Sequence, residues 1–217
     1  MFLPEKHHYN DYENKIREGL TSYLPGSKAQ FRMAPVERPT RGTDHRTKKA
    51  GVLLLLFPEN NEVATVFIQR PVYDGVHSGQ ISLPGGKEEG PDNNLTETAL
   101  RETEEEIGIV SKDVKILGEL TTLYIPASNI LVQPVIGSMP YRPELKPDIR
   151  EVERIFVVSM SELSDPSCIR KETFIENNKK FYAPYYKVDD LQIWGATAMI
   201  LSEFIEVHTV VSANSLR

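Results

Sequence analysis

Three glutamates in one acidic segment are the residues of this sequence best suited to chemistry. Glu105 and Glu106 follow Glu102 at offsets of three and four positions. On a helix that turns by about 100° per residue, their carboxylates share one face, and Glu104 points to roughly the opposite side. Like charges gathered in this way destabilise an isolated helix, whereas hard divalent cations such as magnesium take oxygen ligands. The spacing therefore favours a metal site, at which bound ions could activate water for attack on phosphorus.

A solvated helix face is the alternative explanation for these acids, since glutamate-rich helices are usually exposed surface. The neighbouring residues favour the metal site. Gly85-Gly86-Lys87 precedes the acidic helix, which reads Arg-Glu-x-x-Glu-Glu-x-Gly from Arg101 to Gly108. We expect a turn at Gly85-Gly86 before the helix; glycine has no Cβ, so the backbone of this turn can approach the acidic face closely.

This pattern resembles the Nudix box, the motif of a family that hydrolyses pyrophosphate linkages. The resemblance implies the α/β Nudix fold, an α/β/α sandwich around a mixed β-sheet, with Mg2+ or Mn2+ as the cofactor. It also implies that Glu102, Glu105 and Glu106 are the metal ligands, and that Glu105 and Arg101 take part in catalysis.

The loop before the helix departs from the usual box. The family places a glutamate six residues after the glycine and eight before the arginine, whereas Asp92 lies six after Gly86 and nine before Arg101. A loop insertion of this kind is known in the coenzyme A pyrophosphatase branch. We expect Asp92 to cap the helix or to pair with Arg101.

A second signature lies upstream of the box. Arg70 stands nine residues before Gly79, and the segment ends in Leu83-Pro84-Gly85-Gly86, which resembles the extra signature of Nudix coenzyme A hydrolases. Leu83 replaces an aromatic residue of that signature. Gly75 stands where the signature usually has a second arginine. If that arginine helps to hold an anionic substrate, this chain must compensate or prefer another substrate.

Arg70, His77, Gly85 and Gly86 are the predicted substrate-binding residues. A guanidinium can bind phosphate through two hydrogen bonds, but a structural salt bridge is an equal alternative for Arg70. His77 could contact a phosphate, or it could be a structural hydrogen-bonding residue.

Two further positions carry open alternatives. Nudix enzymes often supply one more glutamate from a later loop, and Glu151 and Glu153 compete for that role as catalytic base or metal ligand; we favour Glu151 over an exposed residue at a strand start. The segment that begins at Trp194 resembles the final helix of the coenzyme A branch. For Trp194 we favour a core anchor over a ligand contact.

The elements that must position these residues alternate along one domain. Apolar runs and turn residues predict helices and strands in mixed order, which indicates an α/β or α+β layered domain. An N-terminal helix and connection at 1–45 precede the catalytic domain at 46–217. Helices are expected at 9–23, 94–107, with Gly108 as its C-terminal cap, and 194–211; strands are expected at 51–57, 63–69, 80–83, 114–124, 130–137 and 152–159, with a hairpin between 169 and 193.

Composition and charge limit the kinds of partner that this protein is expected to bind. The formal net charge of −6 argues against a general nucleic-acid binder, so a small nucleotide-derived molecule is the expected partner. Val52 to Phe57, the longest apolar run, is too short to span a bilayer, and residues 1–10 lack the apolar core of a signal peptide. With the single cysteine, Cys168, these features favour a cytoplasmic protein without a membrane partner. The resemblance also allows a homodimer.

Three functions compete at this point. The coenzyme A branch implies hydrolysis of coenzyme A or acyl-CoA to 3′,5′-ADP and (acyl-)4′-phosphopantetheine. A second reading is a Nudix enzyme for another nucleoside diphosphate derivative, such as ADP-ribose, a dinucleotide or a modified nucleoside triphosphate. A third is a non-catalytic, ligand-sensing Nudix domain, which the complete set of helix carboxylates disfavours.

Overall fold

The computed structural model describes residues 5–36, 42–73, 77–176 and 179–213. Within these residues the centre is an eight-stranded mixed sheet with the path β3-β2-β1-β7-β5; β4 also pairs with β1, β6 with β7 and β8 with β2. Its strands are β1 (Lys48–Glu59), β2 (Glu62–Gln69), β3 (Ile81–Ser82), β4 (Gly85–Lys87), β5 (Lys115–Glu119), β6 (Leu123–Ile125), β7 (Ile130–Ser138) and β8 (Arg154–Ser159).

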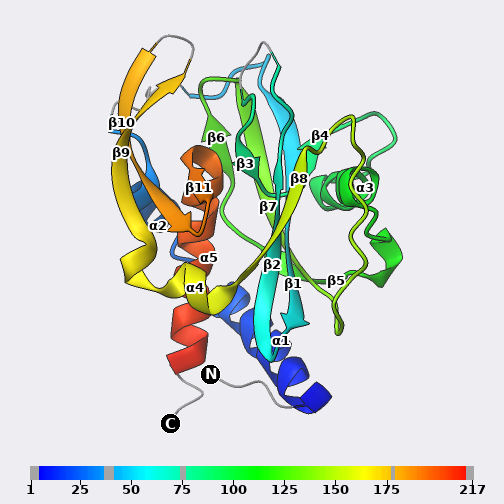
Figure 1. Ribbon diagram of the computed structural model, residues 1–217. Coiled ribbons are helices and arrows are strands. Elements are labelled where there is room, and N and C mark those ends of the chain that lie inside the picture. The colour runs from blue at the N-terminus through cyan, green and yellow to red at the C-terminus, as the bar shows by residue number, and fades with distance from the viewer. Residues whose placement is uncertain (1–4, 37–41, 74–76, 177–178, 214–217) are drawn as a thin grey trace.

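Helices cover both faces of this sheet (Figure 1). Helix α3 lies on one face, and α1 and α5 lie on the other. The helices are α1 (Glu5–Ser22), α2 (Ser27–Gln30), α3 (Leu95–Ile107), α4 (Met160–Ser164) and α5 (Gly195–Ala213), with 3-10 turns at Phe31–Met33, Ser111–Asp113 and Pro166–Cys168.

Strand β1 shows why the layers form. Leu53 and Leu55 pack in the core beneath α3, and Leu54 and Leu56 pack in the core beneath α1 and α5. All four side chains are fully buried. A strand covered on both faces has a continuous apolar run instead of an alternating pattern, which is what residues 52–57 display. The predicted α/β/α sandwich around a mixed sheet is therefore confirmed.

Helix α3 begins and ends where its sequence predicts. Asn94 is the N-cap, and its side chain accepts a hydrogen bond from the backbone N–H of Glu97 at 2.9 Å. Gly108 ends the helix in the left-handed conformation, with φ of 74°. Ala99 and Ile107 are fully buried against the sheet, so the apolar stripe of the helix fixes which face carries the acids.

The approach of α3 to the sheet is unusually close. A Cβ atom on Gly51 of β1 would overlap the carbonyl oxygen of Leu95 and lie 2.9 Å from the nitrogen of Ala99. Beside it, Gly86 pairs with Gly51 as part of β4. The predicted turn at Gly85-Gly86 was therefore wrong, because these glycines continue as a strand that brings its backbone directly beneath the helix.

A separate three-stranded sheet completes the structure, in the order β11-β10-β9. It comprises β9 (Ile169–Glu176), β10 (Lys179–Val188) and β11 (Leu191–Trp194), whereas only a hairpin was predicted here. The single strand predicted at 114–124 is likewise two strands, β5 and β6. Helix α5 begins directly after Trp194. By length and composition alone α5 could cross a membrane, but 56% of it is buried inside the fold, as expected for a core helix.

Helix α1 begins four residues before its predicted start. Tyr12, Ile16 and Leu20 are buried in the same core as α5, but Tyr23, the last residue of the predicted helix, lies outside the helix and is 47% exposed. Its hydroxyl donates to Glu206 of α5 at 2.7 Å. Because α1 shares its core with the rest of the chain, the proposed division at residue 45 remains a prediction.

The close contact between α3 and β1 generates a stability prediction. Gly51→Ala should lower the free energy of unfolding by about 1–3 kcal/mol, the usual cost of overpacking, because helix backbone must move to make room. Gly90→Ala is the matched control: it lies in the loop before the same helix, and no atom lies within 4 Å of its added Cβ. Urea denaturation of both variants measures the difference, and equal stabilities would contradict the packing described.

Candidate metal and substrate site

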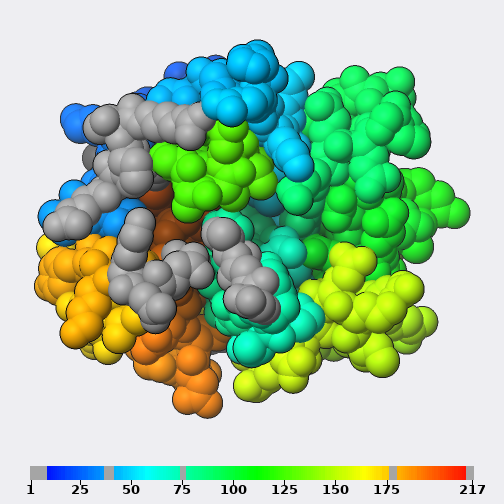
Figure 2. Space-filling view, turned by 90° about the horizontal axis from the view of Figure 1, so that it is seen from above, coloured from blue at the N-terminus to red at the C-terminus, as the bar shows by residue number. Residues whose placement is uncertain are grey.

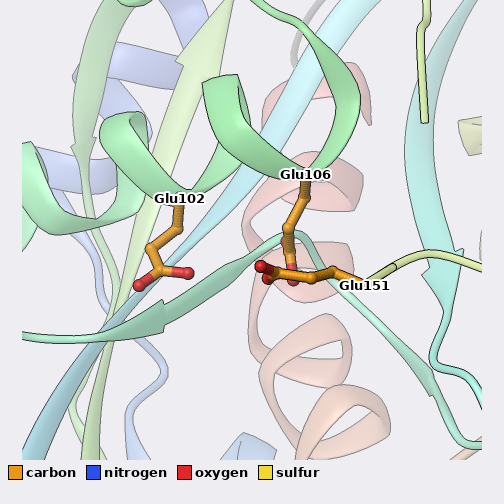
Figure 3. A group of neighbouring side chains, drawn as sticks. All are labelled: Glu102, Glu106 and Glu151. Atoms are coloured by element: carbon orange, nitrogen blue, oxygen red, sulfur yellow. The ribbon is translucent and has the colours of Figure 1, made fainter. Parts of the chain in front are cut away.

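Three carboxylates from two distant segments meet above β4. Glu102 and Glu106 lie one turn apart on α3, and Glu151 enters from the loop before β8 (Figure 3). One oxygen from each lies within 4.8 Å of the others. This group is called the carboxylate cluster below. All its donors are oxygens, which suits a hard divalent cation.

Backbone hydrogen bonds bring Glu151 to the cluster. The N–H of Asp148 donates at 2.9 Å to the carbonyl of Glu106 at the C-terminal end of α3, and the N–H of Glu153 donates at 2.9 Å to the carbonyl of Gln69 at the end of β2. The loop is therefore held at both sides of Glu151. Glu153 is exposed and outside the cluster, so the geometry favours Glu151 over Glu153 as the additional glutamate expected from a later loop.

Glu106 is the most perturbed member of the cluster. Its side chain is 1% exposed, and burial raises its pKa to about 7, with Glu102 and Glu151 adding to the rise. The opposing groups are the Gly85 N–H, which donates at 2.8 Å, and the Arg70 guanidinium at 3.8 Å. Burial also raises the pKa of Glu102. The protein thus leaves the cluster short of positive charge, and a divalent cation would supply it.

Arg101 organises the acids around the cluster. Its Nε and Nη2 each donate at 3.0 Å to the Asp92 carboxylate, and its Nη1 donates to Glu102 at 3.1 Å. The hydrogen bond from Arg101 holds the pKa of Asp92 well below its usual range. The predicted pairing of Asp92 is therefore confirmed, and the capping alternative is wrong because Asn94 occupies the cap.

Glu105 lies apart from the cluster. Its side chain is 55% exposed and accepts a hydrogen bond from Arg101 at 3.2 Å. It follows that Glu102 and Glu106, at an offset of four, share the face above β4, while Glu105 lies toward its edge. The metal and catalytic roles predicted for Glu105 remain predictions, as does the catalytic role of Arg101.

A cavity of about 550 Å³ is lined by the cluster and by the predicted substrate-binding residues. Arg70, His77, Gly85 and Gly86 line it together with the three carboxylates, whereas Arg101 and Glu105 are outside its lining. Seen from above, the molecule is hollowed between the light-green segment that contains β6 and the teal segment that contains β3 and β4 (Figure 2). The substrate-binding roles assigned from sequence remain predictions, but these residues share one space with the cluster.

Both readings of Arg70 and His77 find support in this cavity. Arg70 Nη2 donates to the Gly85 carbonyl at 3.2 Å and lies 3.8 Å from Glu106, yet its side chain is 30% exposed. His77 Nδ1 lies 3.0 Å from the side-chain oxygen of Gln80. Each side chain is thus held by structural contacts and still faces the cavity. Gly75, the position of the missing arginine, lies outside the described residues.

Sequence reasoning missed the apolar wall of this cavity. Leu83, Ile125 and Ile200, with neighbours on β7 and α5, line it in addition to the charged groups, and Lys48 adds a cation. These residues come from separate elements and form no local motif. Only the folded arrangement of β1, β6 and α5 brings them together, so no sequence signal could have identified them.

A second cavity of about 590 Å³ adjoins the first. Tyr73 and Gln80 line both cavities, and Trp194 and Phe174 line only the second. The Trp194 ring stacks on Phe174 with centroids 4.8 Å apart. Trp194 therefore belongs to an aromatic cluster but is only half-buried and faces a cavity, so the core-anchor role favoured from sequence over a ligand contact remains a prediction.

Comparisons with known proteins agree on one family. The model of the NUDIX domain matches residues 47–183. The chain is 30% identical to the mitochondrial coenzyme A diphosphatase NUDT8 of Homo sapiens over 58% of this chain and 54% of that protein, so it spans about half of that relative. It is 26% identical to the peroxisomal coenzyme A diphosphatase NUDT7 of Mus musculus over 77% of this chain and 70% of that protein.

Solved structures support the fold independently. The crystal structure of a Nudix hydrolase from M. smegmatis, RenU, superposes with a TM-score of 0.55 at 15% identity, covering 82% of this chain and 94% of that one. At this identity the likeness concerns the fold alone.

The charge balance of the cluster generates a metal-binding prediction. Below about pH 7 a cation must displace the proton on Glu106, because ligands bind metal in the deprotonated form. Mg2+ or Mn2+ should therefore raise the Tm of the protein more at about pH 8 than at about pH 6. Glu106→Gln should largely remove both the stabilisation and its pH dependence.

Glu104→Gln is the matched control on the same helix. Glu104 is exposed and accepts hydrogen bonds from Ser111 outside the cluster, so this variant should respond to metal as the unmodified protein does. An equal loss in both variants, measured by thermal denaturation with and without metal, would refute the metal assignment.

Proposed function

The chain belongs to the NUDIX domain family, and from that membership we propose that it hydrolyses coenzyme A or acyl-CoA to 3′,5′-ADP and (acyl-)4′-phosphopantetheine in a metal-dependent reaction. At the coarser level it is a Nudix hydrolase of small nucleotide-derived substrates. The finer assignment to coenzyme A rests on the residues that line the cavity of the carboxylate cluster and on the resemblance of the chain to coenzyme A diphosphatases.

One observation carries the proposal: the cavity of the carboxylate cluster also has an apolar wall. Leu83, Ile125 and Ile200 line the same space as Glu102 and Glu106. A nucleoside triphosphate carries a ribose and a base beyond its phosphates but no aliphatic chain, whereas an acyl-pantetheine chain offers aliphatic segments on one side of the pyrophosphate. Burial of such a chain is favourable at about 25 cal/mol per Å², so this wall favours coenzyme A derivatives.

The proposed reaction adds water across the P–O–P bridge. The water oxygen forms a bond to one phosphorus, the bridging oxygen leaves with the other phosphate, and one water proton must be accepted. Glu151 is exposed at the open side of the cluster, where it can accept that proton. Divalent cations held by Glu102 and Glu106, with Glu105 as the further predicted ligand, would neutralise phosphate charge and lower the pKa of water.

Arg70 and His77 have a separate task. Arg70 and His77 face the cavity beside the Gly85-Gly86 backbone, where they can hold the nonbridging oxygens of the pyrophosphate. Arg101 acts through other residues: it orients Glu102 and fixes the loop at Asp92. We therefore assign Arg101 a positioning role in this reaction.

Other properties inferred from sequence remain predictions. A cytoplasmic location is untested, and the names of the two relatives place them in mitochondria and peroxisomes. A homodimer is equally untested. A Nudix enzyme for ADP-ribose, a dinucleotide or a modified nucleoside triphosphate is the alternative function, since all share the pyrophosphate chemistry of the cluster.

Substrate competition tests the proposal directly. With Mg2+ or Mn2+, kcat/KM for coenzyme A should exceed that for ADP-ribose and for a nucleoside triphosphate by at least about tenfold, which corresponds to about 1.4 kcal/mol of transition-state binding. EDTA should abolish the reaction, and added cation should restore it. A tenfold preference for either rival would replace the coenzyme A assignment and leave the family membership intact.

The distal carboxylate has a test of its own. Glu151→Gln should lower kcat by about 10²–10⁴-fold, the usual contribution of a general base. Glu153→Gln should leave kcat near its original value, because the contact of Glu153 with Gln69 uses its backbone N–H. A larger loss at Glu153 would transfer the role to that residue.

A further inference from the structure

The second cavity lies between the two sheets, next to the carboxylate site. Gln69 of β2 and Arg154 of β8 line it from the main sheet, and Phe174 of β9 and Trp194 line it from the smaller sheet. Because Tyr73 and Gln80 line this cavity and the carboxylate cavity alike, one elongated ligand can occupy both.

Aromatic rings form one wall of the second cavity. Trp194 stacks on Phe174 at 4.8 Å with 24° between their planes, and both rings pack against Phe181, at 5.2 and 5.9 Å. Tyr185 meets Phe174 edge-on at 5.7 Å. Phe181 pairs across the strands with Phe174, and Tyr185 pairs with Trp194, so the sheet itself fixes the surface before any ligand arrives.

The exposure of these rings distinguishes the wall from an ordinary core. Phe174 and Trp194 are only half-buried, whereas the large apolar side chains of the main core, such as Phe67 and Phe204, are fully buried. Aromatic rings that are fixed by neighbours and open on one side suit the stacking of a planar ligand, because stacking needs an accessible face.

Polar groups surround the aromatic wall. The side chains of Gln69, Gln80 and Gln192 line the cavity with amides, and Asp190 adds a carboxylate. Amides both donate and accept hydrogen bonds, as does the edge of a purine ring. Arg154, whose guanidinium lies 4.8 Å above the Phe156 ring, is the arginine that lines this cavity.

The two adjoining cavities therefore differ in chemistry. The first has an aliphatic wall of Leu83, Ile125 and Ile200, and the second has an aromatic wall with amides and an arginine. Coenzyme A has the same asymmetry: an aliphatic chain on one side of the pyrophosphate and a purine nucleotide on the other.

We propose that the second cavity is the binding site for the purine nucleotide half of the substrate, with the base stacked on the wall formed by Phe174 and Trp194. This inference rests on the proposed function, because it assigns one end of that substrate. It places the aliphatic half in the first cavity and the scissile bond at the carboxylate cluster, which lines that cavity.

The single tryptophan of the chain makes the proposal measurable without turnover. Trp194 is the only one in the sequence, so fluorescence excited where tryptophan absorbs and tyrosine does not reports on this wall. In metal-free protein, 3′,5′-ADP should quench the fluorescence in a saturable manner, and 4′-phosphopantetheine should not. Quenching by 4′-phosphopantetheine alone, or by neither ligand, would overturn the assignment.

A pair of variants on the same sheet separates stacking from general damage. Phe174→Leu removes a ring of the wall and should raise the Kd for 3′,5′-ADP by about tenfold, since stacking on one aromatic side chain commonly contributes that much or more; Phe174→Tyr should restore binding. Tyr182→Leu is the matched control, because Tyr182 is exposed and adjoins Phe181, so it points to the opposite face of β10. Equal effects of Phe174→Leu and Tyr182→Leu would refute the subsite.

This experiment and the substrate competition can fail independently. If ADP-ribose is the preferred substrate but purine nucleotides still quench Trp194 and require Phe174, the subsite stands and the coenzyme A assignment falls. If coenzyme A is preferred but 3′,5′-ADP leaves Trp194 unchanged, the subsite falls and the proposed function stands.

Discussion

The close approach of α3 to the paired strands β1 and β4 is the constraint on which the site depends. Gly51 leaves room for the helix backbone, and a Cβ atom on Gly86 would overlap the Glu102 carboxylate. With no side chain between helix and strand, the Gly85 N–H can donate directly to Glu106 at 2.8 Å. Any residue larger than glycine at these positions would separate the acids from the backbone that holds them. The two glycines and the helix therefore act as one unit, although they are separate in sequence.

The same close packing makes the burial of a charged carboxylate at this site unfavourable in free energy. A carboxylate that is 1% exposed loses hydration, and its attraction to Arg70 at 3.8 Å and to one N–H replaces only part of it. The chain compensates more fully at the periphery, where Arg101 binds Asp92 and Glu102. The positive charge of Arg101 thus fixes the loop and one carboxylate, while the centre of the carboxylate cluster stays short of positive charge. This division is what a cation site requires, because full compensation by protein groups would leave a metal nothing to neutralise.

Local signals predicted the helix and the acids that it presents, and non-local contacts decided the rest. Asn94 and Gly108 are caps that act within one turn, so the phase of Glu102 and Glu106 could be derived from spacing. Glu151 could be favoured only by resemblance, because its position depends on a bond from Asp148 to the end of α3. The strand at Gly85–Lys87 was mistaken for a turn because consecutive glycines are typical of turns, and only pairing with β1 makes them a strand. The aromatic wall was missed for the same reason: Phe174 and Trp194 are distant in sequence and meet only when the small sheet folds.

Arg70 and Gln80 link the second cavity with the carboxylate cluster. The two residues are joined, since the N–H of Arg70 donates to the carbonyl of Gln80 at 3.1 Å. Arg70 reaches toward Glu106 and Gly85 on one side, and Gln80 lines both cavities. A ligand in the second cavity would therefore lie beside Gln80, whose carbonyl is bonded to the residue that contacts Gly85 and Glu106. In the proposed reaction, binding energy from the nucleotide end can in this way be used to orient the pyrophosphate at the carboxylate cluster, since correct positioning of the reacting atoms contributes to the rate.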